Sequence, residues 1–276
     1  MKPVALALAV VALCSVSLTQ TSSQKPLVPQ RPVGIDEMSA PATASCEFNF
    51  SSGSGNTYLY YCVSVNGNVF YINTPVGYAQ NSVYEGYGFC DANQPAAYYD
   101  YGFQGDSGNW NAPTLVGSNA TTVKISRTTS DGLWTLTQTI TQVASNATVK
   151  IVMTLRNNTA VARTAYLIRY NYVSPDGFVF ANYDGTQDSA FAWRSAPNPA
   201  QLIPSHGLAL QNVGNPAFPQ WGGVPQNTAL GPNPCAFAYN WTGGLASNIN
   251  GSLVMAYVGT VPAMTGKTVT MTYKGL

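Results

Sequence analysis

The stretch from Val123 to Val173 constrains the fold most, because apolar and polar residues alternate along it in four runs. In the second run, Trp134, Leu136 and Ile140 fall on one side of an extended chain, and a row of threonines falls on the other. A period of two is that of a half-buried β-strand. Turn-forming pairs separate the runs, namely Asp131-Gly132, Ser145-Asn146 and Asn157-Asn158. The stretch therefore predicts an antiparallel meander in which successive runs pair.

Further strands are expected on both sides of this meander. Asn66-Gly67 predicts a hairpin with a two-residue loop, which would place Val63 opposite Phe70 and Cys62 opposite Tyr71. We expect a short strand from Ser189 to Arg194 and a closing strand pair at 252–259 and 267–273. The proline-rich segment 197–234 is expected to be a long loop, and 175–185 a turn-rich excursion.

These patterns together predict the fold class. Apolar spacing of three and four does not persist anywhere after the N-terminus, so no helix is expected. About a dozen short strands at close spacing indicate a sandwich or barrel. We predict an all-β, antiparallel β-sandwich, with a large two-sheet supersandwich as one form of it, a central meander and long loops. A single domain is expected over residues 46–276.

The N-terminus predicts export. Met1 and Lys2 precede an apolar run that ends near Leu18, which is typical of a secretory signal, here over residues 1–17. The run is too short to span a bilayer, and no transmembrane segment is expected later. An alternative interpretation makes Cys14 a lipid-modified anchor. Residues 18–45 are rich in Pro, Ser, Thr and Gln and are expected to form a disordered leader. We predict a secreted or cell-surface protein.

Charge limits the partners. Only 8% of residues are charged, and the formal net charge is +1. A neutral surface without a basic cluster argues against nucleic acid as a partner. It suits an uncharged ligand such as a neutral polysaccharide or a cell-surface glycan. No motif in the sequence indicates a cofactor.

The cysteines predict two disulfides. Removal of the signal leaves an even set, Cys46, Cys62, Cys90 and Cys235, in an oxidising compartment. Of the three possible connectivities, we favour Cys46 with Cys62 and Cys90 with Cys235, because Cys62 lies on the face of the hairpin that a preceding strand would cover. A metal site would need clustered ligands, and the sequence has neither a CxxC motif nor a second histidine.

One short motif resembles a hydrolase nucleophile segment. Gly105-Asp106-Ser107-Gly108 is similar to that of trypsin-like serine proteases, and its first three residues match the GDS-type lipases. The trypsin-like family needs a histidine before the serine, but His206 follows it. The lipase-type family needs an aspartate three residues before its late histidine, where Ile203 stands. We interpret the motif as a turn and His206 as a loop residue.

Two sets of acidic residues are candidate sites. Glu85 and Asp100 form a candidate catalytic pair, since glycoside hydrolysis needs two carboxyl groups about 5 to 10 Å apart. Alternatively, each carboxylate caps a turn or pairs with one of the few arginines. A candidate calcium site comprises Asp176, Asn182, Asp184 and Asp188, although their spacing is not that of a calcium loop and Asx-turns also explain it.

The aromatic residues give the leading functional hypothesis. The chain has 17 tyrosines, and one aromatic group lies in a Gly- and Asn-rich segment: Tyr98, Tyr99, Tyr101 and Trp110. We expect these rings to form an exposed platform that stacks on sugar rings, against the alternative that they pack in the core. Three functions stay open: a carbohydrate-binding module, a hydrolase that uses paired carboxylates, and a structural envelope protein without catalytic activity.

Overall fold

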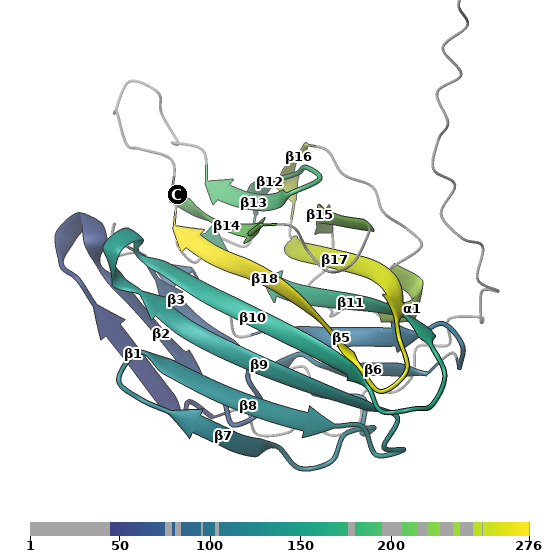
Figure 1. The fold of residues 1–276 in the computed structure, drawn as a ribbon. Helices are drawn as coiled ribbons and strands as arrows, with labels where there is room; N and C mark the ends of the chain where they lie inside the picture. Colours follow the sequence, from purple (N-terminus) through teal and green to yellow (C-terminus); the bar gives the residue numbers. More distant parts are fainter. Residues whose placement is uncertain are drawn as a thin grey trace, which may run out of the picture.

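The fold is all-β and antiparallel, as the sequence predicts (Figure 1). The computed structural model describes residues 45–74, 79–80, 84–94, 96–102, 105–175, 180–194, 206–214, 220–226, 234–237, 245–249 and 251–275. The predicted signal peptide, Cys14 and the leader up to residue 44 lie outside these ranges. Within them, the strands form three hydrogen-bonded sheets instead of the two expected.

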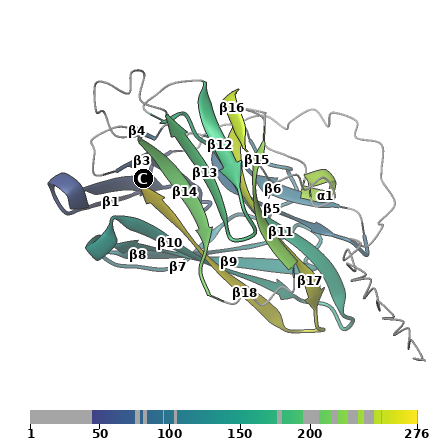
Figure 2. The same cartoon turned by 90° about the horizontal axis from the view of Figure 1, so that it is seen from above.

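The largest sheet has nine strands in the order β16-β12-β13-β14-β18-β10-β9-β8-β7. Their bounds are β7 Thr114–Ser118, β8 Thr122–Thr128, β9 Trp134–Val143, β10 Thr148–Asn157, β12 Ala181–Gly185, β13 Ser189–Arg194, β14 His206–Asn212, β16 Ala246–Ile249 and β18 Gly266–Gly275. Strands β7 to β10 and β18 lie side by side as one layer of the sandwich (Figures 1 and 2).

The second layer is a five-stranded sheet in the order β15-β17-β11-β5-β6. It contains β5 Glu85–Asp91, β6 Ala97–Asp100, β11 Arg163–Tyr172, β15 Gln220–Gln226 and β17 Ser252–Val261. A four-stranded sheet contributes apolar residues to the same core and contains β1 Phe48–Ser52, β2 Leu59–Val63, β3 Val69–Asn73 and β4 Ala79–Gln80. The short helical turns are η1 Gly55–Thr57, η3 Ala144–Asn146 and α1 Pro234–Phe237.

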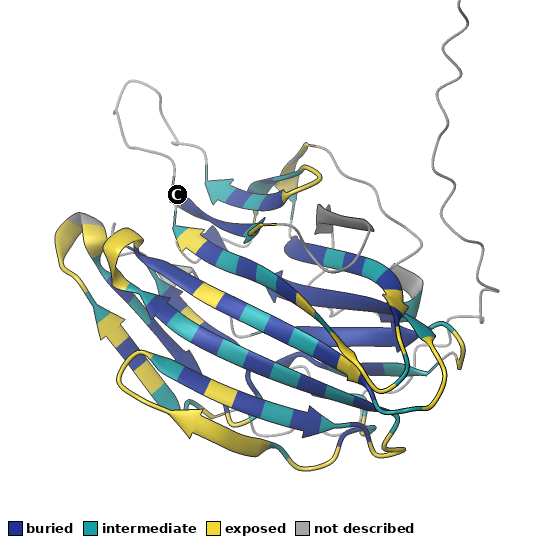
Figure 3. Cartoon of the chain, viewed as in Figure 1, coloured by how far each residue is buried: buried dark blue, intermediate teal, exposed yellow. Residues whose placement is uncertain are grey.

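The predicted alternation produces the main core. Along β9, buried and partly exposed residues alternate without a break, with Trp134, Leu136 and Ile140 inside (Figure 3). Strand β10 buries Val149, Ile151, Met153 and Leu155 in the same way. The threonines of β9 lie on the opposite face, where their hydroxyl groups bond to those of the neighbouring strand, as Thr137 does with Ser126 at 3.2 Å. Apolar residues from all three sheets meet in one cluster.

The meander is confirmed for three of its four runs. Strands β8, β9 and β10 pair in sequence order, but β11 crosses to the second layer and pairs with β17 and β5. The free side of β10 is taken instead by β18. Most residues of β11 are buried, including residues on both faces of the strand. This burial fits the position of β11 in the middle of the five-stranded sheet. The closing strands β17 and β18 exist as predicted but lie in different sheets, so their expected pairing is wrong.

The N-terminal hairpin has a different register from the predicted one. Val63 pairs with Val69 and Cys62 with Phe70, so the loop runs from Ser64 to Asn68. The longer loop forms because the Ser64 hydroxyl group accepts hydrogen bonds from the backbone N–H groups of Asn66 and Asn68, at 3.3 and 3.1 Å. Because the Ser64 side chain satisfies these backbone N–H groups, it favours the longer loop over the predicted two-residue turn.

Segments expected as loops contain strands. Residues 197–234 include β14 and β15, residues 175–185 include β12, and α1 begins at Pro234 although no helix was expected. His206 is the first residue of β14 and pairs with Arg194, so the expectation that it lies in a loop is wrong. Tertiary pairing overrides the weak local strand propensity of these Gly- and Pro-rich segments.

Both predicted disulfides are present. Cys46 is bonded to Cys62 and Cys90 to Cys235, which fits an oxidising compartment. The second bond holds α1 against β5, where Pro234 packs so closely on Gly88 that a Cβ atom there would lie 2.6 Å from the proline Cγ. In the part of the chain that the structure describes, no helix has the length and apolarity to cross a membrane.

Candidate functional site

Polar side chains interrupt the core where the two main layers face each other. Arg127 on β8, Gln138 on β9 and Arg169 on β11 each occupy an inward position of a strand whose other inward residues are mostly apolar. Arg169 is 0% exposed and Arg127 5%. A buried charge is tolerated only when it is paired and hydrogen-bonded. Both arginines meet a predicted candidate carboxylate.

The first pair is formed by Glu85 of β5 and Arg169. The Arg169 Nε donates to the Glu85 Oε1, and its other nitrogens donate to the Gln138 side chain at 2.6 Å and to the Gly67 carbonyl at 3.2 Å. Glu85 also accepts the hydroxyl group of Tyr273 at 2.8 Å and the backbone N–H of Val69 at 2.6 Å. The carboxylate thus joins all three sheets.

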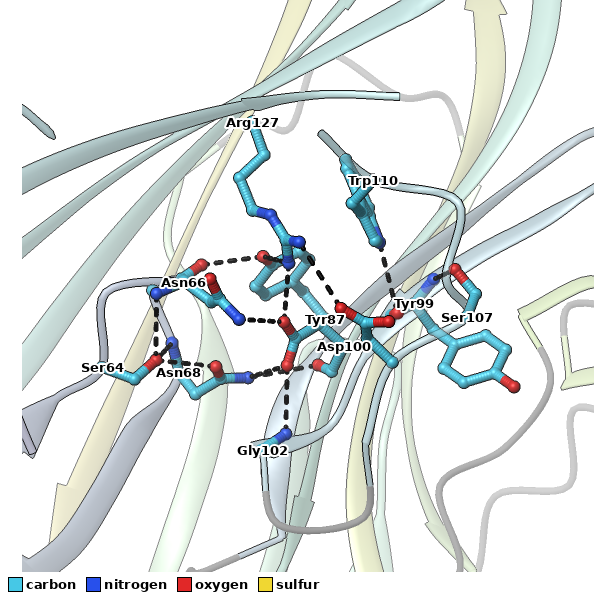
Figure 4. Close-up of polar contacts among 12 residues, drawn as sticks. Ser64, Asn66, Asn68, Tyr87, Tyr99, Asp100, Gly102, Ser107, Trp110 and Arg127 are labelled. Atoms are coloured by element: carbon cyan, nitrogen blue, oxygen red, sulfur yellow. Dashed lines mark hydrogen bonds and ion pairs between the residues drawn. The ribbon is translucent and has the colours of Figure 1, made fainter. Parts of the chain in front are cut away.

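The second pair is formed by Asp100 of β6 and Arg127 (Figure 4). The Arg127 Nη1 lies 2.6 Å from the Asp100 Oδ2, and it also donates to the Tyr87 hydroxyl group at 3.2 Å. Asp100 accepts further bonds from the side chains of Asn66 and Asn68, at 2.8 and 3.0 Å. We call the two ion pairs and the side chains that bond to them the ionic centre: Glu85, Arg169, Asp100, Arg127, Asn66, Asn68, Tyr87, Gln138 and Tyr273.

The hairpin loop Ser64–Asn68 closes the ionic centre. Asn68 donates to the backbone carbonyl of Glu85 and to Asp100, while the carbonyl of Asn66 accepts the Tyr87 hydroxyl group at 2.7 Å. Gly67 has φ +91°, and a Cβ atom there would lie 2.4 Å from the Gln138 amide nitrogen. Only glycine fits this position. The side-chain amides of Asn66 and Asn68 therefore satisfy the Asp100 carboxylate, whereas the loop meets Glu85 only at its backbone carbonyl.

The ionic centre is closed to solvent. Glu85 is 0% exposed and Asp100 1%. Burial raises the pKa of both carboxyl groups, and the facing arginines oppose that rise. The structure thus brings the two candidate catalytic residues together through shared loop contacts, but each is paired with an arginine, as the alternative interpretation held. Acid–base work on a substrate would require the Ser64–Asn68 loop to move away.

The expected exposed aromatic platform is wrong for three of its four rings. Tyr98 and Tyr101 are 2% exposed and Trp110 is 9% exposed. Trp110 packs edge-on against Phe89 at 5.8 Å and donates its indole N–H to the Tyr99 carbonyl at 3.2 Å. Tyr98 stacks on Phe89 at 4.6 Å. Tyr98 and Trp110 belong to the main core between the layers, because large aromatic surfaces bury well there.

Tyr99 is the exception, and it belongs to a second aromatic group. It is partly exposed on the face of the five-stranded sheet that is turned away from the main core. Its ring stacks on that of Tyr101 at 5.2 Å with 11° between the planes, and Tyr101 contacts Tyr170 at 5.1 Å. Tyr84 is also partly exposed and contacts Tyr172 at 5.8 Å. We call this group the outer tyrosine cluster: Tyr84, Tyr99, Tyr101, Tyr170 and Tyr172.

A hydrogen-bonded aspartate links the buried Tyr98 to the turn between β8 and β9. Asp131 accepts the Tyr98 hydroxyl group, the Thr129 hydroxyl group at 2.6 Å and the Leu133 N–H at 3.0 Å. Partial burial alone would raise the pKa of Asp131, but the hydrogen bonds from Thr129, Tyr98 and Leu133 outweigh it and lower the pKa.

We expect Asp131→Asn to lower the free energy of unfolding by about 1 kcal/mol at pH 7. A lowered carboxyl pKa contributes stability that is present above the unfolded-state pKa of about 4 and is lost as pH falls through the folded-state pKa. The difference between the two proteins should therefore shrink below pH about 4. Urea unfolding across this pH range measures it, and a difference that grows in acid would contradict the assignment.

The hydrolase-like motif forms a turn. The Asp106 carboxylate accepts the Gly108 N–H at 2.7 Å, and the Ser107 hydroxyl oxygen accepts the Tyr99 N–H at 3.2 Å. Asp106 also lies 3.5 Å from Arg127. These contacts hold the motif in a turn, which agrees with its interpretation from the sequence.

The candidate calcium residues lie in and between β12 and β13, except for Asp176, which falls outside the described residues. The Asp184 carboxylate accepts the Gly185 N–H at 2.8 Å, and Asp188 contacts Asn212 at 3.4 Å. Among the described residues, no three Asp, Glu, His or Cys side chains gather as metal ligands would.

Comparison with known proteins relates the fold to several solved structures. The chain is similar to part of a bacterial glucoamylase that was solved in complex with acarbose, with a TM-score of 0.53 and 7% identity over 86% of this chain. It covers 33% of the glucoamylase chain, so it spans about a third of that protein. This likeness shows a shared fold.

Two weaker likenesses extend over nearly the whole of the other protein. A putative aldose 1-epimerase from Escherichia coli K12 has a TM-score of 0.41 and 11% identity, and 83% of this chain covers 98% of it. A protein from Synechocystis sp. PCC 6803 has a TM-score of 0.45 and 8% identity, with coverage of 86% and 98%. No protein-family model matches the chain, and no curated protein is similar to it in sequence.

Sequence reasoning missed most of the ionic centre. It named Glu85 and Asp100, but not Arg127, Gln138 or Arg169. The available signal was a polar residue at an inward position of a strand, as Gln138 is between Leu136 and Ile140. Such a residue has to find a buried partner, so a break in alternation marks a polar site inside the core.

Proposed function

We propose that the protein is an extracellular carbohydrate-binding module whose contact surface includes the outer tyrosine cluster. The observation that carries this proposal is the position of Tyr99. Its ring is partly exposed and is held parallel to that of Tyr101, which in turn contacts the ring of Tyr170 at 5.1 Å. A pre-oriented aromatic ring can stack on the apolar face of a sugar at little cost in side-chain entropy.

A neutral glycan is the ligand class that fits this surface. The rings of the outer tyrosine cluster and the apolar residues packed with them carry no formal charge. Tyrosine hydroxyl groups both donate and accept hydrogen bonds, which suits sugar hydroxyls. The two disulfides are consistent with an extracellular setting, where free polysaccharides and cell-surface glycans occur.

We expect Tyr99→Ala to weaken binding to a neutral polysaccharide by about 1 kcal/mol, which is about fivefold in Kd. The wild-type protein is first screened on a glycan array, and the best ligand is then titrated by calorimetry. Tyr58→Ala is the matched control, because Tyr58 is also partly exposed but lies between η1 and β2, outside the outer tyrosine cluster.

Two outcomes would count against the proposal. If the wild-type protein binds no neutral glycan on the array, the binding function is wrong, and a structural envelope role becomes the better hypothesis. If Tyr58→Ala and Tyr99→Ala weaken binding equally, the outer tyrosine cluster is not the contact surface.

Hydrolysis by Glu85 and Asp100 is the second candidate function. The same hairpin contacts both residues, which supports a shared site: Asn68 donates to the Asp100 carboxylate and to the backbone carbonyl of Glu85, and Val69 donates its N–H to the Glu85 carboxylate. Against it stand their burial and their arginine partners. A reducing-sugar assay on the array ligand separates the two functions, since a binding module releases no product.

A further inference from the structure

The sequence contains six Asn-x-Ser/Thr triplets in which x is not proline, and they begin at Asn49, Asn119, Asn146, Asn157, Asn240 and Asn250. Such a triplet accepts an N-linked oligosaccharide when the chain passes through a eukaryotic secretory compartment. Asn240 and Asn250 lie outside the described residues. The other four triplets have the same chemistry, so their surroundings in the fold decide which can carry a sugar.

Asn157 cannot carry a sugar in the folded protein. It is 0% exposed at the end of β10. Its Nδ2 atom donates to the carbonyl groups of Val161 at 2.7 Å, Val261 at 3.1 Å and Pro262 at 3.3 Å. An N-linked sugar replaces a hydrogen on this nitrogen, and there is no room for it. A chain modified at Asn157 would lose contacts with the carbonyl groups of Val161, Val261 and Pro262.

Asn119 has the opposite arrangement. It is exposed in the turn between β7 and β8, and its Oδ1 atom accepts the N–H of Thr121 at 2.9 Å and the hydroxyl group of the same residue at 3.2 Å. Two donors at one atom identify that atom as the oxygen. The Nδ2 atom has no hydrogen-bond partner within the described residues, so a sugar there leaves the turn intact.

Asn49 and Asn146 share these properties. Asn49 is exposed on β1, and its Oδ1 atom accepts the Tyr60 hydroxyl group at 2.9 Å, which an attached sugar does not prevent. Asn146 is exposed at the end of η3. As with Asn119, the described part of the chain offers no acceptor to either Nδ2 atom.

We propose that Asn49, Asn119 and Asn146 carry N-linked oligosaccharides in the secreted protein and that Asn157 does not. In each transfer, the Nδ2 atom forms a bond to the anomeric carbon of an oligosaccharide carried on a polyprenyl diphosphate. The bond between that carbon and the diphosphate oxygen breaks, the lipid diphosphate leaves, and the amide gives up one proton to a base of the transferase. No oxidant or reductant takes part.

Two of these sites lie at the same end of the large sheet. The turn with Asn119 joins β7 to β8, and the turn with Asn146 joins β9 to β10 (Figure 1). The pairing of Thr122 with Thr141 places the two turns next to each other. Their glycans therefore gather at this end of the large sheet.

The test is glycopeptide mapping of the full chain secreted from eukaryotic cells. Enzymatic removal of N-glycans in heavy-oxygen water converts each occupied asparagine to a labelled aspartate. We expect the label at Asn49, Asn119 and Asn146 and an unmodified Asn157. Single Asn→Gln variants at the first three positions should each lose one glycan on a gel, whereas Asn157→Gln should keep the wild-type mobility.

The proposal fails if the three exposed sites are unoccupied or if folded, secreted protein carries a sugar on Asn157. In a control protein, residues 1–17 are replaced by a leader that is known to direct secretion. Absence of glycans on this protein cannot then be explained by poor export. Binding to the glycan array is measured separately, and its outcome leaves the glycosylation result unaffected.

Discussion

Replacement of Arg169 with methionine is expected to lower the free energy of unfolding by about 3 to 5 kcal/mol. The substitution leaves the Glu85 carboxylate buried without its cation, because Glu85 is 0% exposed and lies between the two layers. It also leaves the Gln138 side chain and the Gly67 carbonyl without a donor that the native protein supplies. Urea unfolding at neutral pH, followed by tryptophan fluorescence, measures the change.

Two controls separate the loss of the ion pair from a general effect of losing an arginine. Arg156→Met removes an exposed arginine from β10 and should change stability by no more than about 0.5 kcal/mol. The double variant Glu85→Gln, Arg169→Met should recover a large part of the loss, because no charge is then left unpaired. A cost below about 1 kcal/mol for Arg169→Met would show that the ionic centre opens to water.

Removal of the disulfide between Cys90 and Cys235 by a double alanine substitution is expected to cost about 2 to 5 kcal/mol. The two cysteines are 145 residues apart, whereas Cys46 and Cys62 are 16 apart. In the chain-entropy account, the longer loop restricts the unfolded chain more, by about 2 kcal/mol for this ratio of lengths. The Cys90 and Cys235 variant should therefore be the less stable of the two double variants.

The same unfolding assay ranks the two disulfide variants. If removal of the Cys46 and Cys62 bond costs more, then strain or contacts around β1 outweigh loop entropy. Peptide mapping under non-reducing conditions checks the pairing beforehand, and a peptide that links Cys46 to Cys235 would overturn it.

The alternation of residues was enough to predict β8, β9 and β10 together with their order. It failed at β11, because a strand buried on both faces has no polar side to reveal its neighbours. Strands β14 and β15 were missed for a related reason. Local sequence gives them little strand propensity, and they form because β18 and β17 offer unpaired edges. Pairing between distant segments is therefore what the sequence conceals.

The candidate site, like the fold, could be predicted only in part. Residue chemistry led to Glu85 and Asp100, and their possible pairing with arginine was recognised, but the identity of the arginines was not. Arg169 lies 84 positions from Glu85, and Arg127 lies 27 from Asp100. The Gly- and Asn-rich surroundings of Tyr98 and Trp110 predict exposed rings, but both rings are buried. In the fold, those residues make the tight turns that let the rings pack inside.

The contacts of Glu85 also determine when the protein can finish folding. Its carboxylate meets Tyr273 of β18, 188 positions further along the chain, and β18 lies between β10 and β14 in the large sheet. A growing chain therefore carries an incomplete ionic centre and an open sheet until β18 has emerged. Contacts of such long separation make folding slow and leave partly made chains prone to aggregate. Completion of both the ionic centre and the large sheet thus waits for β18.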